Sequence, residues 1–240
     1  MNFNITEKMF TFFHRLIEKN FHLKKISKII KNSSNSNNPI IFDVGSNVGE
    51  SIELFLDLYE NPTIYSFEPQ KESFEILIDK YDKNEKIKLF KLAFGSKKEE
   101  LNLKINIKSS TSTFSKINTN SKYFKLKSLI LSNKKKNIFL NEEKAQVEKI
   151  DNFLVNQKIQ YIDILKIDTE GFELEVIKGA EEALKKTKVI IIEFHLNDMY
   201  LDYNPKKIED LLHSNNFTLM KSLKFPFMQY EDRIYINKKF

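Results

Sequence analysis

The chain of 240 residues contains no cysteine, which excludes disulfide bonds and thiolate metal sites. No apolar run reaches the roughly 18 residues that a membrane-spanning helix needs, and the first residues lack the apolar core of a signal peptide. We therefore expect a cytoplasmic protein without a transmembrane segment. Arginine is also scarce, with only Arg15 and Arg233. Because base-edge and bidentate phosphate contacts favour arginine, nucleic acid is not expected as a partner.

Glycine is scarce too, and two of the five glycines, Gly45 and Gly49, lie together in the segment IIFDVGSNVGE. In such a chain, glycine is expected where the backbone turns sharply or touches a ligand. The apolar run before them predicts a buried strand over Ile40–Val44, then a tight loop and a helix over Glu50–Tyr59. This order of strand, loop and helix is typical of a nucleotide-cofactor site.

The next strand and the composition of the loop indicate the type of cofactor. A strand predicted over Thr63–Phe67 ends at Glu68. Glu68 follows the first glycine at the spacing where a carboxylate commonly holds the ribose hydroxyls of the ligand. The loop has neither the GxGxxG of dinucleotide sites nor the GK of a P-loop, which favours an adenosyl ligand without phosphates, such as S-adenosylmethionine. A turn without any ligand is the alternative. The residues after a strand predicted over Lys88–Leu92 are expected to contribute as well. The expected cofactor-binding residues are therefore Asp43, Gly45, Ser46, Asn47, Glu68, Pro69, Ala93, Phe94 and Asp168.

Four motifs resemble one known family. DVGSNVGE, FEP at 67–69, LAFGS at 92–96 and DILKIDTEGFELEVIKGA at 163–180 look like the FkbM family of S-adenosylmethionine-dependent methyltransferases. The resemblance covers about Pro39 to His195 and includes all five glycines. It implies a Rossmann-like class I methyltransferase fold and the O-methylation of a hydroxyl, commonly on a sugar or a natural product.

A second cluster of polar residues lies after two apolar runs. Lys166, Asp168 and Glu170 alternate at the exit of a strand predicted over Tyr161–Ile167, so an extended backbone would project them to one side at the carboxyl end of the sheet. Unpaired charges there would be costly, which favours a mutually compensated network near the site. An ion pair that only fixes the turn is the alternative. The next strand, predicted over Lys188–Phe194, brings Glu193 and His195 to the same edge.

These side chains are the candidate catalytic groups: His195, Asp168, Glu193 and Lys166. Transfer of a methyl group to a hydroxyl requires removal of the acceptor proton, and His195 is the first candidate for that base. Asp168 is the competing base. A competing mechanism has Asp168, Glu170 or Glu193 hold a divalent cation that lowers the pKa of the acceptor.

Positive charge is concentrated in residues 101–141, which contain nine lysines and no acidic residue. This lysine-rich segment predicts an anionic acceptor, such as a nucleotide-linked sugar or an acidic glycan. The alternative is a solvated insertion whose lysines keep the protein soluble.

Three regions organise the chain. Residues 1–38 are expected to form an N-terminal extension, with one or two amphipathic helices over Glu7–Lys31 and a polar linker, NSSNSNN. Four roles are open for the extension: it could cover the core, close over the site, form a homodimer contact or lie on a membrane surface. Residues 39–240 would form one methyltransferase domain with the lysine-rich segment inserted. Its mostly parallel α/β sheet would end in an antiparallel hairpin over Phe217–Ser222 and Arg233–Asn237.

The pattern as a whole predicts an O-methyltransferase acting on a hydroxyl of a sugar, nucleotide-sugar or glycoconjugate precursor. Two alternatives remain on the same fold: an RNA or protein methyltransferase, and a binding protein without chemistry. The low arginine content counts against the first, and the second polar cluster counts against the last.

Overall fold

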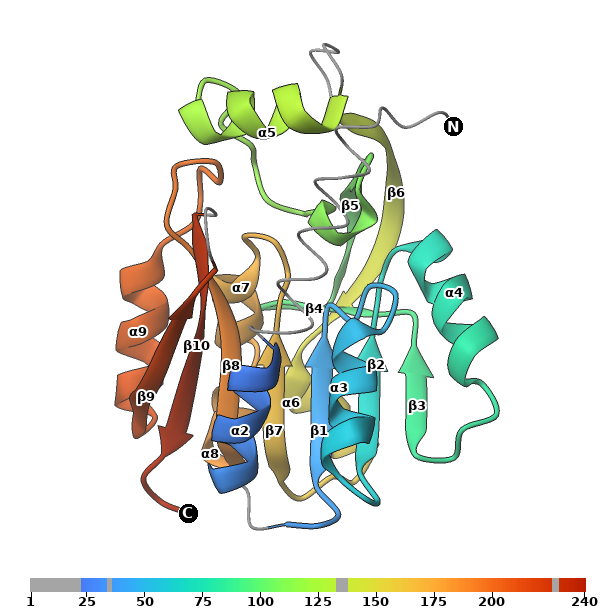
Figure 1. Cartoon of the computed structure of the whole chain (residues 1–240), viewed down its shortest axis with the longest axis vertical. Coiled ribbons are helices and arrows are strands. Elements are labelled where there is room, and N and C mark those ends of the chain that lie inside the picture. Colours follow the sequence, from blue (N-terminus) through green and yellow to red (C-terminus); the bar gives the residue numbers. More distant parts are fainter. Residues whose placement is uncertain (1–22, 34–35, 133–137, 226–228) are drawn as a thin grey trace.

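The computed structural model describes residues 23–33, 36–132, 138–225 and 229–240 (Figure 1). Its central sheet has seven strands in the order β3-β2-β1-β7-β8-β10-β9. Neighbouring strands from β3 to β8 are parallel, whereas β10 runs antiparallel to both β8 and β9. The strands are β1 (Ile40–Val44), β2 (Thr63–Phe67), β3 (Ile87–Phe90), β7 (Ile162–Ile167), β8 (Thr187–His195), β9 (Phe217–Lys224) and β10 (Tyr230–Asn237). The predicted α/β fold with a C-terminal hairpin is confirmed.

Helices cover both faces of this sheet, as a parallel sheet requires. In β1, Ile41 packs into one hydrophobic cluster and its neighbour Phe42 into the other, because successive side chains of a strand point to opposite faces. On one face lie α2 (Leu23–Ser33), α3 (Glu50–Leu58) and α4 (Lys71–Tyr81), and on the other α6 (Ile150–Asn156), α7 (Glu173–Lys178), α8 (Glu181–Lys185) and α9 (Pro205–Ser214). Figure 1 shows α2 and α3 in front of the sheet and α6 behind it.

The first two strands have the predicted bounds, and α3 ends one residue earlier than predicted. The prediction of a strand over Lys88–Leu92 is wrong in its end. β3 stops at Phe90, because the chain then leaves the central sheet and Ala93–Phe94 pair as β4 with another strand.

A small second sheet, in the order β4-β6-β5, accompanies the central one. It contains β4 (Ala93–Phe94), β5 (Glu99–Asn106) and β6 (Phe139–Glu148), and the chain between β5 and β6 forms the short 3-10 helix η2 (Ser109–Thr111) and α5 (Lys122–Ser132). In Figure 1, α5 and the upper parts of β5 and β6 stand above the carboxyl ends of β1 and β2. The described part of the lysine-rich segment therefore lies on the side of the sheet where ligands bind. Lys134, Lys135 and Lys136 lie outside the described residues.

Of the predicted N-terminal extension, the structure describes α2 and residues 36–38. Ile26 and Ile30 of α2 are buried in the cluster that contains α3, so this helix covers the core. Residues 1–22 lie outside the described part, and the division into an extension and a domain stays a prediction. Among the described helices, none has the length and apolar character needed to cross a membrane.

Candidate active site

The loop between β1 and α3 has the backbone shape that its glycines suggest. Gly45, Asn47 and Gly49 are left-handed, with φ of 87°, 45° and 92°. The N–H groups of Gly45 and Ser46 both donate to the Phe67 carbonyl, at 3.0 and 3.1 Å. A Cβ on Gly45 would lie 1.8 Å from the carbonyl oxygen of Asp168. The loop is thus packed directly against the turn that follows β7, and only glycine fits at its first position.

Glu68 ties the end of β2 to this loop. Its Oε2 accepts a hydrogen bond from the Asn47 N–H at 2.8 Å, and its Oε1 accepts one from the Gln70 N–H at 2.7 Å. Burial raises the pKa of Glu68 to about 7, although both backbone hydrogen bonds oppose the shift. Each carboxylate oxygen has a further lone pair, so Glu68 can also accept hydroxyl groups of a ligand.

A buried charge network lies under the loop. Asp43 is fully buried; its Oδ2 accepts a hydrogen bond from Ser51 Oγ at 2.6 Å, and its Oδ1 lies 3.7 Å from Lys166 Nζ. Lys166 also pairs with Asp168 Oδ2 at 3.1 Å. Burial lowers the pKa of Lys166, but Asp168 and Asp43 outweigh that effect and raise it. Lys166 therefore stays charged and links the end of β1 to the end of β7.

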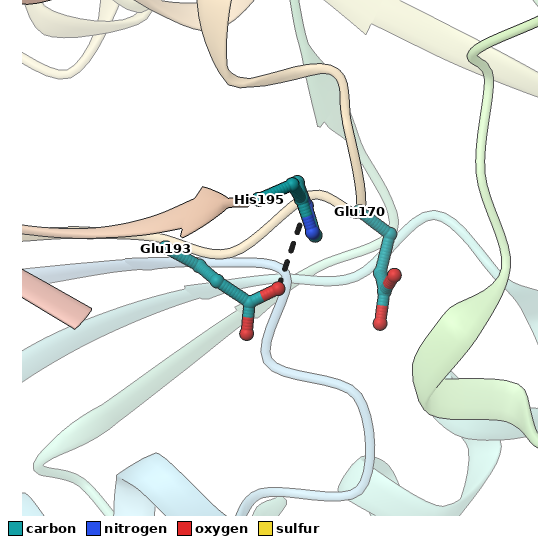
Figure 2. Close-up of side chains that lie close together, drawn as sticks. All are labelled: Glu170, Glu193 and His195. Atoms are coloured by element: carbon teal, nitrogen blue, oxygen red, sulfur yellow. Dashed lines mark ion pairs between the residues drawn. The ribbon is translucent and has the colours of Figure 1, made fainter. Parts of the chain in front are cut away.

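The second polar cluster consists of His195, Glu193 and Glu170 (Figure 2). His195 Nε2 lies 3.4 Å from Glu193 Oε1, and ligand atoms of all three residues lie within 4.8 Å of one another. The ring of His195 is buried between Tyr200 and Tyr203, with ring centroids 4.7 and 5.2 Å away. The structure thus brings together the β8 residues and the β7 exit, as the sequence pattern predicts.

Glu170 reaches this cluster by a different route from the predicted one. Its φ is 51°, so the extended backbone that pairs Lys166 with Asp168 does not continue to Glu170. The chain turns there, and the Tyr200 hydroxyl donates to Glu170 Oε2. Lys127 of α5 lies 3.7 Å from the same oxygen. The prediction that three alternating residues share one side is therefore wrong for Glu170, because a left-handed turn interrupts the alternation.

Sequence reasoning missed Glu173, which holds this turn. Its Oε1 accepts hydrogen bonds from Thr169 N–H, Thr169 Oγ1 and Gly171 N–H at 2.9, 3.1 and 3.1 Å. Burial raises the pKa of Glu173, but the nearby His195 ring and the backbone hydrogen bonds hold it below its ordinary value. An acidic residue in the first turn of a helix, two residues after a glycine, was the available signal.

Carboxylates dominate the electrostatics at the carboxyl ends of β7 and β8. Burial and the charges of Asp168, Glu170, Asp232 and Glu173 raise the pKa of Glu193 well above its ordinary value. Partial burial raises the pKa of Asp168 and the Lys166 ammonium lowers it; with the charges of Glu170 and Asp232 added, the pKa lies above its ordinary value. A carboxylate with a raised pKa is a better acceptor for a proton near neutral pH.

The Methyltransferase FkbM domain matches residues 43–219, which include both polar clusters and most of the described sheet. The chain belongs to this family. It is an S-adenosylmethionine-dependent methyltransferase. The 2-O-methyltransferase NoeI of Sinorhizobium fredii is 25% identical over 183 residues, which cover 73% of this chain and 72% of NoeI.

Two solved structures share the fold of this FkbM methyltransferase. The magnesium protoporphyrin IX methyltransferase of Synechocystis PCC 6803, with bound S-adenosylmethionine, aligns with a TM-score of 0.55 at 10% identity, over 99% of this chain and 86% of that one. TrmK of M. capricolum, with S-adenosyl-homocysteine, aligns with a TM-score of 0.50 at 14% identity, over 91% and 68%. At these identities the likeness concerns the fold alone.

The residues of the FkbM methyltransferase loop fit S-adenosylmethionine. The carboxylate of Glu68 suits ribose hydroxyls, and the buried Asp43 Oδ1 has no hydrogen-bond partner in the described structure. Other predicted contacts are less direct. Ser46 Oγ donates to the Asp43 carbonyl, and the Phe94 ring packs 4.5 Å from the Phe67 ring in the core. That Ala93, Phe94 and Pro69 contact the cofactor stays a prediction.

Replacing Glu68 with alanine is expected to weaken binding of S-adenosylhomocysteine by roughly 1–3 kcal/mol, because a charged hydrogen-bond acceptor is lost. Since binding to ribose hydroxyls favours the ionised carboxylate, wild-type affinity should rise by up to about tenfold from about pH 6 to about pH 8, through the raised pKa of about 7. Calorimetric titration across this range measures both effects.

The matched control is Glu72→Ala, which removes an exposed carboxylate four residues further on in α4. That variant should bind like the wild type at every pH. Equal affinities and equal pH profiles for Glu68→Ala and Glu72→Ala would contradict the assignment of Glu68 to the cofactor site.

Proposed function

We propose that this methyltransferase transfers a methyl group to a hydroxyl of a sugar, nucleotide-sugar or glycoconjugate precursor. The observation that carries the proposal is the position of proton-accepting side chains beside the cofactor loop. Asp168 begins the turn against which Gly45 packs, and Glu193 lies near it on the neighbouring strand. An alcohol becomes an effective nucleophile only as its proton is removed, so a hydroxyl acceptor needs such groups.

Bound S-adenosylmethionine supplies an activated methyl group. The chain holds the adenosyl part through Glu68 and the loop around Asn47, and it positions the acceptor at the carboxyl ends of β7 and β8. We assign removal of the acceptor proton to Asp168, whose side chain is 36% exposed, whereas that of His195 is 5% exposed. Lys166, 3.1 Å from Asp168, fixes the orientation of that carboxylate.

A hollow next to Asp168 has a lining that suits the hydroxyls of a sugar. It is partly open to solvent and lies between α2, α3 and the strands β8 and β10. Carboxylates of Asp168, Glu193 and Asp232 line it together with the rings of Phe225 and Tyr230, whose centroids lie 5.2 Å apart. Carboxylates accept hydrogen bonds from hydroxyls, and aromatic rings pack on apolar faces. The 2-O-methyltransferase activity of NoeI also supports an oxygen acceptor.

The acidic edge and the lysine-rich segment together favour a nucleotide-sugar over a nucleic acid. Phosphates next to Asp168 and Glu193 would be repelled, whereas exposed lysines of α5, Lys122 and Lys125, suit phosphates at a distance from the transferred methyl group. Arg233 is paired with Glu231 and Glu209. RNA and protein acceptors are the second candidate class, favoured by no contact of the described residues.

A labelling experiment tests the acceptor class. The protein is incubated with methyl-labelled S-adenosylmethionine and, in parallel, with neutral oligosaccharides, nucleotide-sugars, RNA and unfolded protein. Mass spectrometry should find the label as a methyl ether on a saccharide, and kcat/KM for a nucleotide-sugar should fall as salt rises. Label found only in RNA or protein would contradict the proposal. A value of kcat/KM that does not depend on salt would show that the lysines of α5 do not take part in acceptor binding.

A further inference from the structure

We propose that Glu170, Glu193 and His195 form a binding site for a divalent transition-metal cation, with Mn²⁺ and Zn²⁺ as the ions best suited to it. The proposal goes beyond cofactor binding and rests on the proposed function only for its catalytic role. It stands on the geometry of the three side chains, on a buried nitrogen that makes no hydrogen bond to the described residues and on the charge around them.

The three side chains converge from two directions. Glu193 and His195 come from the end of β8, and Glu170 comes from the turn after β7 (Figure 2). Their ligand atoms lie within 4.8 Å of one another. Two ligands on opposite sides of one ion lie about 4 Å apart, since each bond is roughly 2.0–2.2 Å long. A small rotation of the glutamate side chains therefore brings all three atoms to coordinating distance.

The His195 ring supplies a second, independent observation. His195 is 6% exposed, yet its Nε2 has no hydrogen-bond partner among the described residues. A buried polar nitrogen without a partner is unfavourable, and native proteins rarely leave one. Edge-on contacts with Tyr200 and Tyr203 fix the ring, and the backbone N–H of His195 donates to the Tyr203 hydroxyl at 3.1 Å. The nitrogen points toward Glu193 in Figure 2, where a cation would satisfy it.

Negative charge around the cluster also favours a cation. The negative charges of four carboxylates repel that of Glu193: Asp168, Glu170, Asp232 and Glu173. Lys166 pairs with Asp43 and Asp168, outside the cluster. Lys127 approaches Glu170 at Oε2 and leaves its Oε1 available. The Tyr200 hydroxyl also donates to Oε2, so we assign Glu170 Oε1 to the cation. A divalent ion would offset the repulsion between these carboxylates.

The donor set indicates the type of ion and its use. One imidazole and two carboxylates suit Mn²⁺ or Zn²⁺ better than Mg²⁺, which prefers oxygen ligands and water. Three protein ligands leave coordination positions open, as in catalytic rather than structural metal sites. An acceptor hydroxyl bound there would have a lowered pKa and would lie beside Asp168. In this arrangement His195 serves as a metal ligand, and the proton goes to Asp168.

Metal binding is tested without any acceptor. The full chain is freed of metal by a chelator, then titrated with Mn²⁺ and, separately, Zn²⁺ by calorimetry, and Mn²⁺ is observed by electron paramagnetic resonance. We expect one ion per chain and a hyperfine coupling to an imidazole nitrogen in pulsed spectra. His195→Gln should remove that coupling, and His195→Gln, Glu170→Gln and Glu193→Gln should each weaken binding at least about tenfold.

The matched control is Asp232→Asn, which removes an equal charge directly across from Glu193 in the β8–β10 pairing. Its metal affinity should stay within about threefold of the wild type. Absence of Mn²⁺ and Zn²⁺ binding, or binding that survives all three ligand substitutions, would overturn the site while leaving the labelling experiment untouched. Metal binding without any methylated saccharide would instead retain the site and reject the proposed function.

Discussion

Replacing Asp168 with asparagine is expected to lower kcat roughly 10²- to 10⁴-fold, the usual contribution of a general base, while S-adenosylmethionine affinity stays within a few-fold of wild type. Asparagine keeps the shape of the side chain and a hydrogen bond to Lys166, but its amide cannot take the acceptor proton. Since Asp168 must be ionised to act and its pKa is raised, wild-type kcat/KM should rise with pH on the acid limb. Single-turnover rates and cofactor titrations on the same samples measure both quantities.

His195→Ala is the informative comparison. It should also lose most turnover, because the cation loses a ligand, but excess Mn²⁺ should restore part of its rate. Excess Mn²⁺ should not restore Asp168→Asn, whose metal ligands are intact. If Asp168→Asn instead keeps a rate within a few-fold of wild type, and His195→Ala stays slow at every Mn²⁺ concentration, His195 is the base.

Gly45→Ala is expected to abolish measurable cofactor binding and to destabilise the protein. The new Cβ would lie 1.8 Å from the Asp168 carbonyl oxygen, so either the loop or the turn after β7 must move. The left-handed φ of 87° adds roughly 1–3 kcal/mol for a residue other than glycine, and overpacking adds about as much. The thermal midpoint should fall by on the order of 10 °C. Differential scanning calorimetry and titration with S-adenosylhomocysteine measure these changes.

Gly49→Ala separates the clash from the backbone strain. Its φ of 92° is nearly the same, but a Cβ there would meet the ring of Tyr81 at 2.7 Å, and a side chain can move more easily than a backbone carbonyl. Gly49→Ala should therefore be the milder substitution and should retain detectable cofactor binding. Equal losses for both variants would show that left-handed strain, and not contact with Asp168, decides the requirement for glycine.

The first half of the cofactor site was predictable because its signals are local. The apolar run before Gly45 and the one before Glu68 each form a buried parallel strand with the predicted bounds. A strand of this kind has few ways to pair, and its carboxyl end meets the ends of its neighbours. The end of β3 was not predictable in the same way, because Leu92 continues an apolar pattern while pairing partners for Ala93 and Phe94 come from β6, more than 50 residues further on.

The second cluster was predictable only in part. That Glu193 and His195 meet the β7 exit follows from strand order, whereas the left-handed turn at Glu170 does not show in an alternating pattern. Glu173, an acidic residue in the first turn of α7, was not among the predicted site residues. Its role in holding Thr169 and Gly171 depends on a hydrogen-bond geometry that only the folded chain has.

The sequence by itself determined the family, through the resemblance of four motifs. It also determined the parallel sheet and the residues at its carboxyl edge, because glycine spacing and apolar periodicity act over short stretches of chain. Only the tertiary structure decided which of those residues are buried, which are exposed and which groups they contact. The approach of α5 to Glu170 through Lys127 comes from a segment distant in sequence. The burial of His195 between two tyrosines and the exposure of Asp168 depend on how the chain folds around them. The reason is physical: burial, charge and hydrogen-bond partners depend on what packs around a side chain, and residue types alone do not specify those neighbours.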